Sequence, residues 1–301
     1  MQSKLDLFMG EHCAGYISIL GKPNAGKSTL LNALVGENLS IVTPKVQTTR
    51  HRILGIRNEE DSQMVFSDTP GILQPAYLLQ ESMMKSVYSS LEDADVLLLI
   101  TSIEEENWEE EPFLEILKNS DIPKAVILNK IDLSDEGLVN QKMDHWKSIL
   151  NPKTVIPISA VKGFNIDSIL SFVSEQLPIH PPYFEKDELS DRHVRFFMSE
   201  IIREKIMQFC QKEVPYSSEV VITTYTEGAD IDRIYAEIIV ERESQKVILI
   251  GKGGEMIKRI GTEARLKMED FLKKRVFVDI RVKVIDGWRS KQAYLKRFGY
   301  E

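Results

Sequence analysis

The sequence is poor in cysteine and has no long apolar run. Two of its 301 residues are cysteines, Cys13 and Cys210, which cannot build a disulfide framework and show no paired metal-ligand spacing. We therefore expect a reducing, cytoplasmic environment. The longest strictly aliphatic run covers residues 96–100, and residues 1–10 lack the apolar stretch of a secretory signal. Because a membrane-spanning helix needs about 20 predominantly apolar residues, we expect no transmembrane segment.

Positive charge is scarce in most of the chain and concentrated at its end. The formal net charge is −8, yet residues 246–301 contain 15 Lys and Arg against 7 Asp and Glu. The preceding 245 residues therefore carry a net charge of −16. An acidic body with a basic end indicates that only the end meets a polyanion, although a solvated basic helix face would have the same composition.

Short apolar runs alternate with amphipathic stretches in the first half of the chain. Five runs are interpreted as buried strands, at residues 16–20, 64–66, 96–100, 125–128 and 155–158. Residues 165–177 have helical apolar spacing, and such alternation predicts a mostly parallel sheet with helices on both faces. Residues 51–58 form a further expected strand. Only five residues separate it from the strand at 64–66, which is too short for a parallel crossover and predicts an antiparallel hairpin.

A proline-rich segment separates two predicted domains. Pro178, Pro181 and Pro182 fall within five residues and precede a polar stretch, a composition that is stiff and poorly helical. We predict a first domain at residues 1–177, a linker at 178–191 and a second domain at 192–301. The second domain is expected to contain a helix and three strands, at residues 192–212, 218–226, 233–240 and 276–284.

A glycine-rich loop follows the first expected strand. Residues 21–28, GKPNAGKS, fit the phosphate-binding pattern G-x-x-x-x-G-K-[ST] in its strand–loop–helix setting. Glycines let successive backbone N–H groups point at phosphate oxygens, and the N-terminal end of the following helix adds positive potential. We expect Lys27 to neutralise the β- and γ-phosphates. The Ser28 hydroxyl is a hard oxygen ligand suited to Mg²⁺.

Three shorter motifs come after later strands. Residues 68–71, DTPG, supply a carboxylate that can hold Mg²⁺ through water and the Gly71 N–H for a γ-phosphate. Residues 129–132, NKID, end in Asp132, whose carboxylate can accept two N–H groups that guanine offers and adenine lacks. Residues 159–161, SAV, can direct backbone N–H groups to the guanine oxygen. Their order and strand-end positions predict a site for GTP and GDP with Mg²⁺.

The basic end contains a second glycine motif. Residues 250–255, IGKGGE, include G-x-x-G, with an apolar lead-in at 247–250, the stretch MIKRI after it and then a strand. This is the pattern of a KH domain, whose glycine loop clamps the backbone of single-stranded RNA. Periodicity predicts a strand at 247–250, whereas the KH pattern predicts a short helix, which we adopt. Ile248 and Ile257 are candidates for the apolar floor under the bases, or for ordinary core.

Taken together, these motifs make the whole chain similar to the Era family, GTPases of the translation-factor class with a C-terminal KH domain. The resemblance implies an α/β P-loop GTPase domain with a six-stranded sheet, and a smaller α+β type II KH domain. It places the first switch at residues 47–51, QTTRH, where we favour Thr49 as a Mg²⁺ ligand with Ser28 and Asp68. Lys27, Thr49 and Gly71 are the implied catalytic residues.

The resemblance also implies two sets of binding residues. The nucleotide-binding set is Gly21, Pro23, Asn24, Ala25, Gly26, Lys27, Ser28, Thr29, Asp68, Gly71, Asn129, Lys130, Asp132, Ser159, Ala160 and Val161. The RNA-binding set is Ile250, Gly251, Lys252, Gly253, Gly254, Lys258, Arg259, Trp288 and Arg289. Trp288 has two interpretations, because it can stack on a base or pack against the last strand.

The residue after Gly71 is Ile72, where other small GTPases have a glutamine that orients the attacking water. We therefore expect slow intrinsic hydrolysis. Some relatives with an apolar residue here use K⁺ held by a phosphate-loop asparagine, and Asn24 matches that position. The alternative for Asn24 is a turn-forming role.

The function implied is a GTP-hydrolysing switch that binds single-stranded ribosomal RNA near the 3′ end of the small-subunit RNA and assists small-subunit assembly. An alternative is a nucleotide-gated RNA-binding module in which hydrolysis is incidental, and a rival of another class is a P-loop kinase acting on a small molecule. We expect a cytoplasmic protein that does not bind DNA. The basic end is compatible with weak peripheral contact to the inner membrane.

Overall fold

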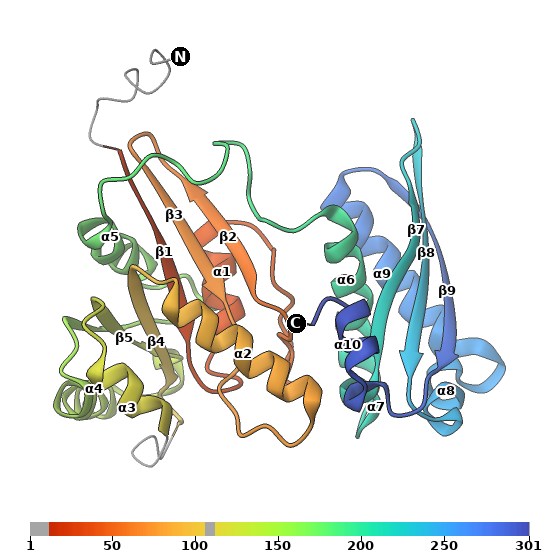
Figure 1. Ribbon diagram of the computed structural model, residues 1–301, viewed down its shortest axis with the longest axis horizontal. Helices are drawn as coiled ribbons and strands as arrows, with labels where there is room; N and C mark the ends of the chain where they lie inside the picture. The colour runs from red at the N-terminus through yellow and green to blue at the C-terminus, as the bar shows by residue number, and fades with distance from the viewer. Residues whose placement is uncertain (1–11, 106–111, 301) are drawn as a thin grey trace. The chain divides into compact units, whose positions relative to one another are not determined.

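The chain divides into two compact units, each with a sheet of its own. The computed structural model describes residues 12–105 and 112–300 (Figure 1). The first unit ends at Asp191, and the second begins at Arg192. Two segments from the first half of the sequence, Ile41–Thr48 and Pro75–Ser82, group with the second unit. The sequence motifs did not indicate that segments from the first half of the chain would group with the second unit.

A six-stranded sheet organises the first unit (Figure 1). Its strands are β1 (Cys13–Leu20), β2 (Ile53–Asn58), β3 (Ser62–Asp68), β4 (Val96–Ser102), β5 (Lys124–Asn129) and β6 (Thr154–Pro157). They lie in the order β2-β3-β1-β4-β5-β6, and every neighbouring pair is parallel except β2 with β3. The expected antiparallel hairpin is thus confirmed. Strands of parallel sheets are covered on both faces and need continuous apolar sequence, and all seven residues of β4 are buried.

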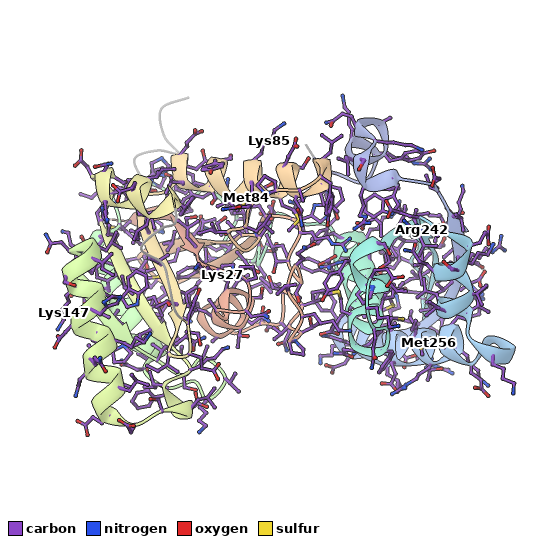
Figure 2. The ribbon with its side chains drawn as sticks, turned by 90° about the horizontal axis from the view of Figure 1, so that it is seen from below. Lys27, Met84, Lys85, Lys147, Arg242 and Met256 are labelled. Atoms are coloured by element: carbon purple, nitrogen blue, oxygen red, sulfur yellow. The ribbon has the colours of Figure 1, made fainter. Side chains whose placement is uncertain are left out.

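Helices cover both faces of this sheet, as the alternating pattern predicted. They are α1 (Lys27–Val35), α2 (Leu78–Glu92), α3 (Pro112–Asn119), α4 (Glu136–Leu150) and α5 (Ile166–Gln176), with a 3₁₀ turn η2 (Ile131–Leu133). The helices α1 and α5 contact each other and β3. A separate apolar cluster joins β4 to Met84 of α2, Leu114 of α3 and Trp146 of α4. Met84 and the solvent-facing Lys147 of α4 are labelled in Figure 2.

The end of the proline-rich segment, residues 188–191, lies along the edge strand β2. Ile56 N donates to Leu189 O at 2.9 Å, and the Ser190 hydroxyl donates to Leu54 O at 2.6 Å. These bonds satisfy backbone groups that an edge strand otherwise leaves unpaired.

The second unit is a three-stranded sheet with helices. Its elements are α6 (Val194–Phe209), α7 (Val214–Ser217), β7 (Glu219–Thr226), β8 (Ile231–Val240), α8 (Glu243–Ile250), η3 (Lys252–Gly254), α9 (Glu255–Leu272), β9 (Arg275–Val284), η4 (Trp288–Ser290) and α10 (Gln292–Arg297). The strand order is β7-β8-β9, with β7 and β8 antiparallel and β8 and β9 parallel. The parallel pair requires a long crossover, which α8, η3 and α9 supply. Residues 247–250 belong to α8, so the strand that periodicity predicted there is wrong and the short helix is correct.

Trp288 belongs to the core of the second unit. Its side chain has 0 % exposure, its Nε1 donates to Ser217 O at 2.9 Å, and Phe298 packs edge-on against its ring. Of the two interpretations offered by the sequence, the structure therefore supports packing. The expectation that Trp288 stacks on RNA does not fit, because a fully buried ring presents no face to a base.

Within residues 12–105 and 112–300, every helix is too short or too polar to cross a bilayer.

Replacing Trp288 tests this packing role. Trp288→Ala removes a fully buried ring and leaves Ser217 O without its donor, so we expect a loss of about 3–5 kcal/mol in the unfolding free energy of the second unit. Urea denaturation followed by circular dichroism measures it. Arg297→Ala, an exposed position at the end of α10, is the control and should change stability by no more than about 0.5 kcal/mol. Equal stability of the two variants would contradict a core role for Trp288.

Candidate nucleotide site and RNA-binding loop

The phosphate loop connects β1 to α1 and needs glycine at two points. Gly26 has a φ of 105°, and a Cβ there would lie 2.2 Å from Asn129 Nδ2. A Cβ on Gly21 would lie 2.3 Å from Ile100 O. Because side chains fit at neither position, the close approach of the loop to β4 and β5 depends on glycine.

Lys27 begins α1 and is buried against the loop (Figure 2). Its Nζ donates to the carbonyl oxygens of Gly21 and Lys22, at 3.0 and 2.9 Å. Burial lowers the pKa of Lys27 to about 8, although the carboxylates of Asp68 and Glu105 act in the opposite direction. A polyphosphate beside this ammonium would supply the counter-charge that the buried site lacks.

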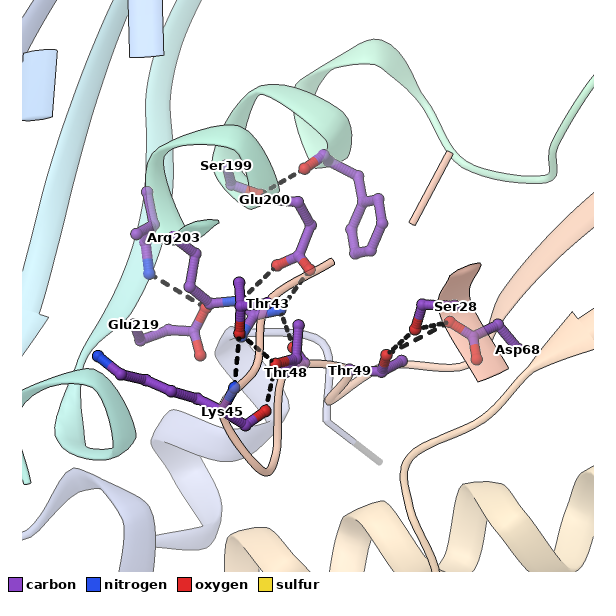
Figure 3. A network of polar contacts seen from close by, with 12 residues as sticks. Ser28, Thr43, Lys45, Thr48, Thr49, Asp68, Ser199, Glu200, Arg203 and Glu219 are labelled. Carbon is purple, nitrogen blue, oxygen red and sulfur yellow. Dashed lines mark hydrogen bonds and ion pairs between the residues drawn. The ribbon is translucent and has the colours of Figure 1, made fainter. Parts of the chain in front are cut away.

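Three oxygen-bearing side chains, those of Ser28, Thr49 and Asp68, meet in one cluster (Figure 3). The hydroxyl oxygens of Ser28 and Thr49 are 2.7 Å apart, and both hydroxyls contact Asp68 Oδ2, at 2.7 and 3.3 Å. Burial raises the pKa of Asp68, against the opposing effects of the Ser28 hydroxyl and Lys27. Asp68 Oδ1 is buried without a hydrogen-bond partner. Hard oxygens around an unsatisfied carboxylate fit Mg²⁺, the ion that the sequence predicted here.

The two threonines of the first switch have different surroundings. Thr49 Oγ1 belongs to the oxygen cluster, whereas Thr48 Oγ1 bonds Thr43 Oγ1 at 2.7 Å and Lys45 O at 2.6 Å. The geometry therefore favours Thr49 over Thr48 as the metal ligand. No three His, Cys, Asp or Glu side chains gather as metal ligands in the described part of the chain, so hydroxyl groups must complete such a site.

The second switch brings Gly71 against the phosphate loop. A Cβ on Gly71 would lie 2.7 Å from the backbone nitrogen of Pro23, and Ile72 N donates to Gly21 O at 3.0 Å. The Ile72 side chain is 7 % exposed and packs in the apolar cluster with Leu20 and Leu99. It therefore offers no polar group that could orient a water.

Asn129 ties together three loops that lie far apart in the sequence. Its Nδ2 donates to Ala25 O at 2.9 Å, and its Oδ1 accepts from Ala160 N at 3.0 Å. These bonds place the SAV segment beside the phosphate loop. Lys130, the next residue, has a φ of 62°, and its Nζ lies 3.5 Å from Glu104 Oε2 in an ion pair. The side chain of Val161, the last residue of the SAV segment, is 83 % exposed.

Asp132 stands after Asn129 and Lys130 in the 3₁₀ turn η2. The Ser159 hydroxyl, then the backbone N–H of Asp132 itself and then Lys162 hold the pKa of the Asp132 carboxyl below its usual value. Lys162 Nζ lies 3.7 Å from Asp132 Oδ2. The sequence analysis did not identify Lys162 as a neighbour of Asp132. Its position two residues after Ala160, in the loop expected to lie near the base, was the available signal.

The G-x-x-G loop of the second unit joins α8 to α9 and depends on left-handed backbone. Gly251, Gly253 and Gly254 have φ values of 73°, 63° and 82°. Nothing lies within 4 Å of a Cβ built on Gly253 or Gly254, so space is open there and only the backbone angle demands glycine. Lys252 is exposed at the tip of the loop.

Two family models match the chain. The first, described as a 50S ribosome-binding GTPase, covers residues 16–130. The second, described as a KH domain, covers residues 213–289. Full-length relatives match as well: GTPase Era of Syntrophus aciditrophicus (strain SB) is 43 % identical, with 95 % of this chain and 95 % of that protein covered.

The chain belongs to the Era family of GTPases.

Members from plastids and solved structures agree with this assignment. The chloroplastic GTPase ERA1 of Zea mays is 43 % identical, over 96 % of this chain and 71 % of that protein. The crystal structure of Era with MgGDPNP and nucleotides 1506–1542 of 16S ribosomal RNA has a TM-score of 0.91 and 38 % identity, covering 96 % of this chain and 99 % of that one. The crystal structure of an Aquifex aeolicus Era variant bound to GDP and AlF₄⁻ has a TM-score of 0.90 and 39 % identity, with coverage of 96 % and 99 %.

The remaining candidates of the Era-family RNA set divide into two groups. Lys258 and Arg259 are exposed on the first turns of α9 beside the glycine loop, and Arg259 also lies 4.0 Å from the centre of the Phe209 ring. Ile248 on α8 is 47 % exposed, which suits a floor residue better than a core one. Arg289 instead pairs with Glu241 at 2.6 Å, so it is engaged within the protein like its neighbour Trp288.

Asp132→Asn tests guanine recognition. The amide donates as well as accepts, so GTP should lose two charge-assisted hydrogen bonds and bind roughly a hundredfold more weakly, while xanthosine triphosphate gains affinity. Competition titrations with a fluorescent nucleotide measure both. Lys162→Ala is the matched control and should change GTP affinity by only a few fold, because its ion pair is solvent-exposed. An unchanged preference for GTP in Asp132→Asn would remove Asp132 from base recognition.

The pKa of Lys27 predicts a pH dependence of binding. Between about pH 8 and 10.5 Lys27 is mostly neutral in the free protein, whereas a bound polyphosphate keeps it protonated. Binding should therefore take up a proton, and GTP affinity should fall with rising pH above 8, by at most about tenfold per pH unit. Calorimetry at pH 8.5 in two buffers of different ionisation enthalpy detects the proton. Lys27→Arg cannot deprotonate there and should lose this uptake. Identical uptake in both proteins would contradict the assignment.

Proposed function

We propose that this chain is a GTP-driven switch that binds single-stranded RNA near the 3′ end of the small-subunit ribosomal RNA and assists small-subunit assembly. Its family membership shows the GTPase activity. The RNA partner is supported by the Era structure that holds 16S ribosomal RNA, which resembles this chain over almost the full length of both. The proposal depends most on one observation: a single chain combines the Ser28–Thr49–Asp68 oxygen cluster with an open G-x-x-G loop.

Hydrolysis breaks the bond from the γ-phosphorus to its bridging oxygen and forms a new one to water. Ser28, Thr49 and Asp68 would hold Mg²⁺, which neutralises phosphate charge when bound. Lys27 contributes a second positive charge, and Gly71 can offer its backbone N–H to the γ-phosphate. Because Ile72 is packed in the core, no side chain at that position orients the water. Intrinsic turnover should therefore be slow, on the order of 10⁻³ s⁻¹ or below.

The first switch provides a route from the nucleotide to the second unit (Figure 3). Thr49 belongs to the first unit, while Thr48 groups with the second. Arg203 of α6 donates to Thr48 O, and Lys45 Nζ donates to Met207 O and Cys210 O at the end of α6. A displacement of Thr49 after γ-phosphate loss would act on Thr48 through a single peptide link.

A K⁺ ion at Asn24 is a second ligand proposal. Asn24 is exposed and has a φ of 65°, a conformation that suits both an ion-facing loop and an ordinary asparagine turn. Turnover measured in equal concentrations of K⁺ and Na⁺ separates the two roles. Faster hydrolysis in K⁺ that is lost in Asn24→Ala supports the ion, and equal rates assign Asn24 to the turn.

We further propose a cytoplasmic location, with weak peripheral contact to the inner membrane through the basic end. The alternative of a nucleotide-gated module in which hydrolysis is incidental is tested by single-turnover hydrolysis with and without RNA. A rate that RNA does not change favours that alternative. The rival P-loop kinase is disfavoured by the NKID motif, which reads guanine rather than a phosphate acceptor.

Gly253→Asp tests the RNA site. The substitution puts a side chain at a φ of 63° and a negative charge where RNA phosphates are expected, so affinity for a 3′-end RNA oligonucleotide should fall at least tenfold, with GTP affinity unchanged. Fluorescence anisotropy measures both. Gly287→Asp is the matched control, because Gly287 also has positive φ, of 57°, but lies outside the loop. Equal RNA affinity in the two variants would overturn the loop assignment.

A further inference from the structure

The sheet of the second unit has a solvent-exposed face. Along β8 and β9 side chains alternate between two faces, and Ile234 and Val276 on one of them are 0 % and 3 % exposed. Phe277, on the other face, is 43 % exposed, and its partner across the strands, Arg233, is exposed as well. Phe277 is therefore an exposed phenylalanine near the start of the edge strand β9, on the sheet face opposite the core.

The side chains around Phe277 flank its ring and leave it exposed to solvent. The Arg233 guanidinium carbon lies 5.9 Å from the centre of the Phe277 ring. Tyr235, two residues further along β8, meets the same ring at a centroid distance of 6.0 Å with the planes inclined by 60°. Aromatic rings on an open sheet, flanked by arginine, are the arrangement on which proteins stack unpaired bases.

The charge of this face suits a polyanion. On β8 and β9 its cations are Arg233, Arg275, Arg281 and Lys283, and its carboxylates are Glu237 and Asp279. The two carboxylates face Lys283 and Arg281, at 3.9 and 3.7 Å. The remaining cations of these two strands are Arg233 and Arg275, in a chain whose net charge is −8, and Arg275 also interacts with the Glu269 carboxylate.

We propose that this face, the Phe277 platform (Arg233, Tyr235, Arg275 and Phe277), is a second RNA-binding site that stacks one or two unpaired bases of the RNA held by the glycine loop. The inference rests on the proposed RNA-binding function and extends it. A KH groove accepts about four nucleotides, so the platform would act on nucleotides outside that groove and lengthen the bound segment.

The test compares two RNA lengths on the full chain. One oligonucleotide has about six nucleotides, enough for the groove, and the other extends the same sequence by about eight unpaired nucleotides on each side. Phe277→Leu keeps an apolar side chain of similar volume but removes the π face, and Phe277→Ala removes both. We expect each variant to bind the long RNA about tenfold more weakly, the effect of losing one base stack, and to bind the short RNA as the unchanged protein does.

Controls make the outcomes distinct. Tyr88 on α2 is also 43 % exposed, so Tyr88→Leu is the matched aromatic control and should bind both RNAs normally. Circular dichroism shows whether the Phe277 variants are folded, and photocrosslinking of thiouridine-labelled long RNA should modify β8 or β9 in the unchanged protein. Equal affinity of folded Phe277→Leu for long RNA, or a lack of crosslinks on these strands, overturns the platform while the groove remains. Failure of the unchanged protein to bind either RNA overturns the proposed function itself.

Discussion

The parallel pairing of β3, β1, β4, β5 and β6 determines where the nucleotide chemistry can occur. Parallel strands end at the same edge of a sheet, so the loops that follow them meet there although they are far apart in the sequence. Asn129 shows the consequence most directly, since its side chain bonds both Ala25 O and Ala160 N. Without the shared edge, the phosphate loop and the segment expected to read the base could not contact one nucleotide.

Burial at that edge gives the polar side chains their properties. Lys27 and Asp68 are charged groups that burial alone would favour as neutral, and their pKa values move toward each other. Such a pair is costly unless further charges and hydrogen bonds satisfy it. Mg²⁺ and a polyphosphate meet this need together, because the ion satisfies Asp68 while the phosphates satisfy Lys27. Asp132 differs, since the Ser159 hydroxyl lowers its pKa by more than burial raises it.

The second unit presents RNA-binding chemistry of a different kind. Gly253 and Gly254 of its G-x-x-G loop face open space and are needed for backbone angle alone, whereas a Cβ on Gly21 or Gly26 of the phosphate loop would clash with β4 or β5. The loop can therefore approach a flexible polyanion without a preformed pocket. The exposed ring of Phe277 adds a surface on which a base could stack without hydrogen bonds to its edge. Such stacking would tolerate any base, because every base has a π face.

Local sequence patterns were enough to predict the phosphate loop, the guanine-recognition motif and the G-x-x-G loop. They also predicted a mostly parallel sheet with helices on both faces. These features depend on residue type and short spacing. Residue types and spacing left open Thr48 or Thr49, a helix or a strand at 247–250, and a stacking or a packing Trp288, and the family resemblance favoured Thr49 and the helix. The tertiary structure shows the helix and the buried ring and puts the Thr49 hydroxyl in the oxygen cluster, because each of these features arises from contacts between distant segments. For the same reason, only the folded chain brings Lys162 to Asp132 and Arg233 to Phe277.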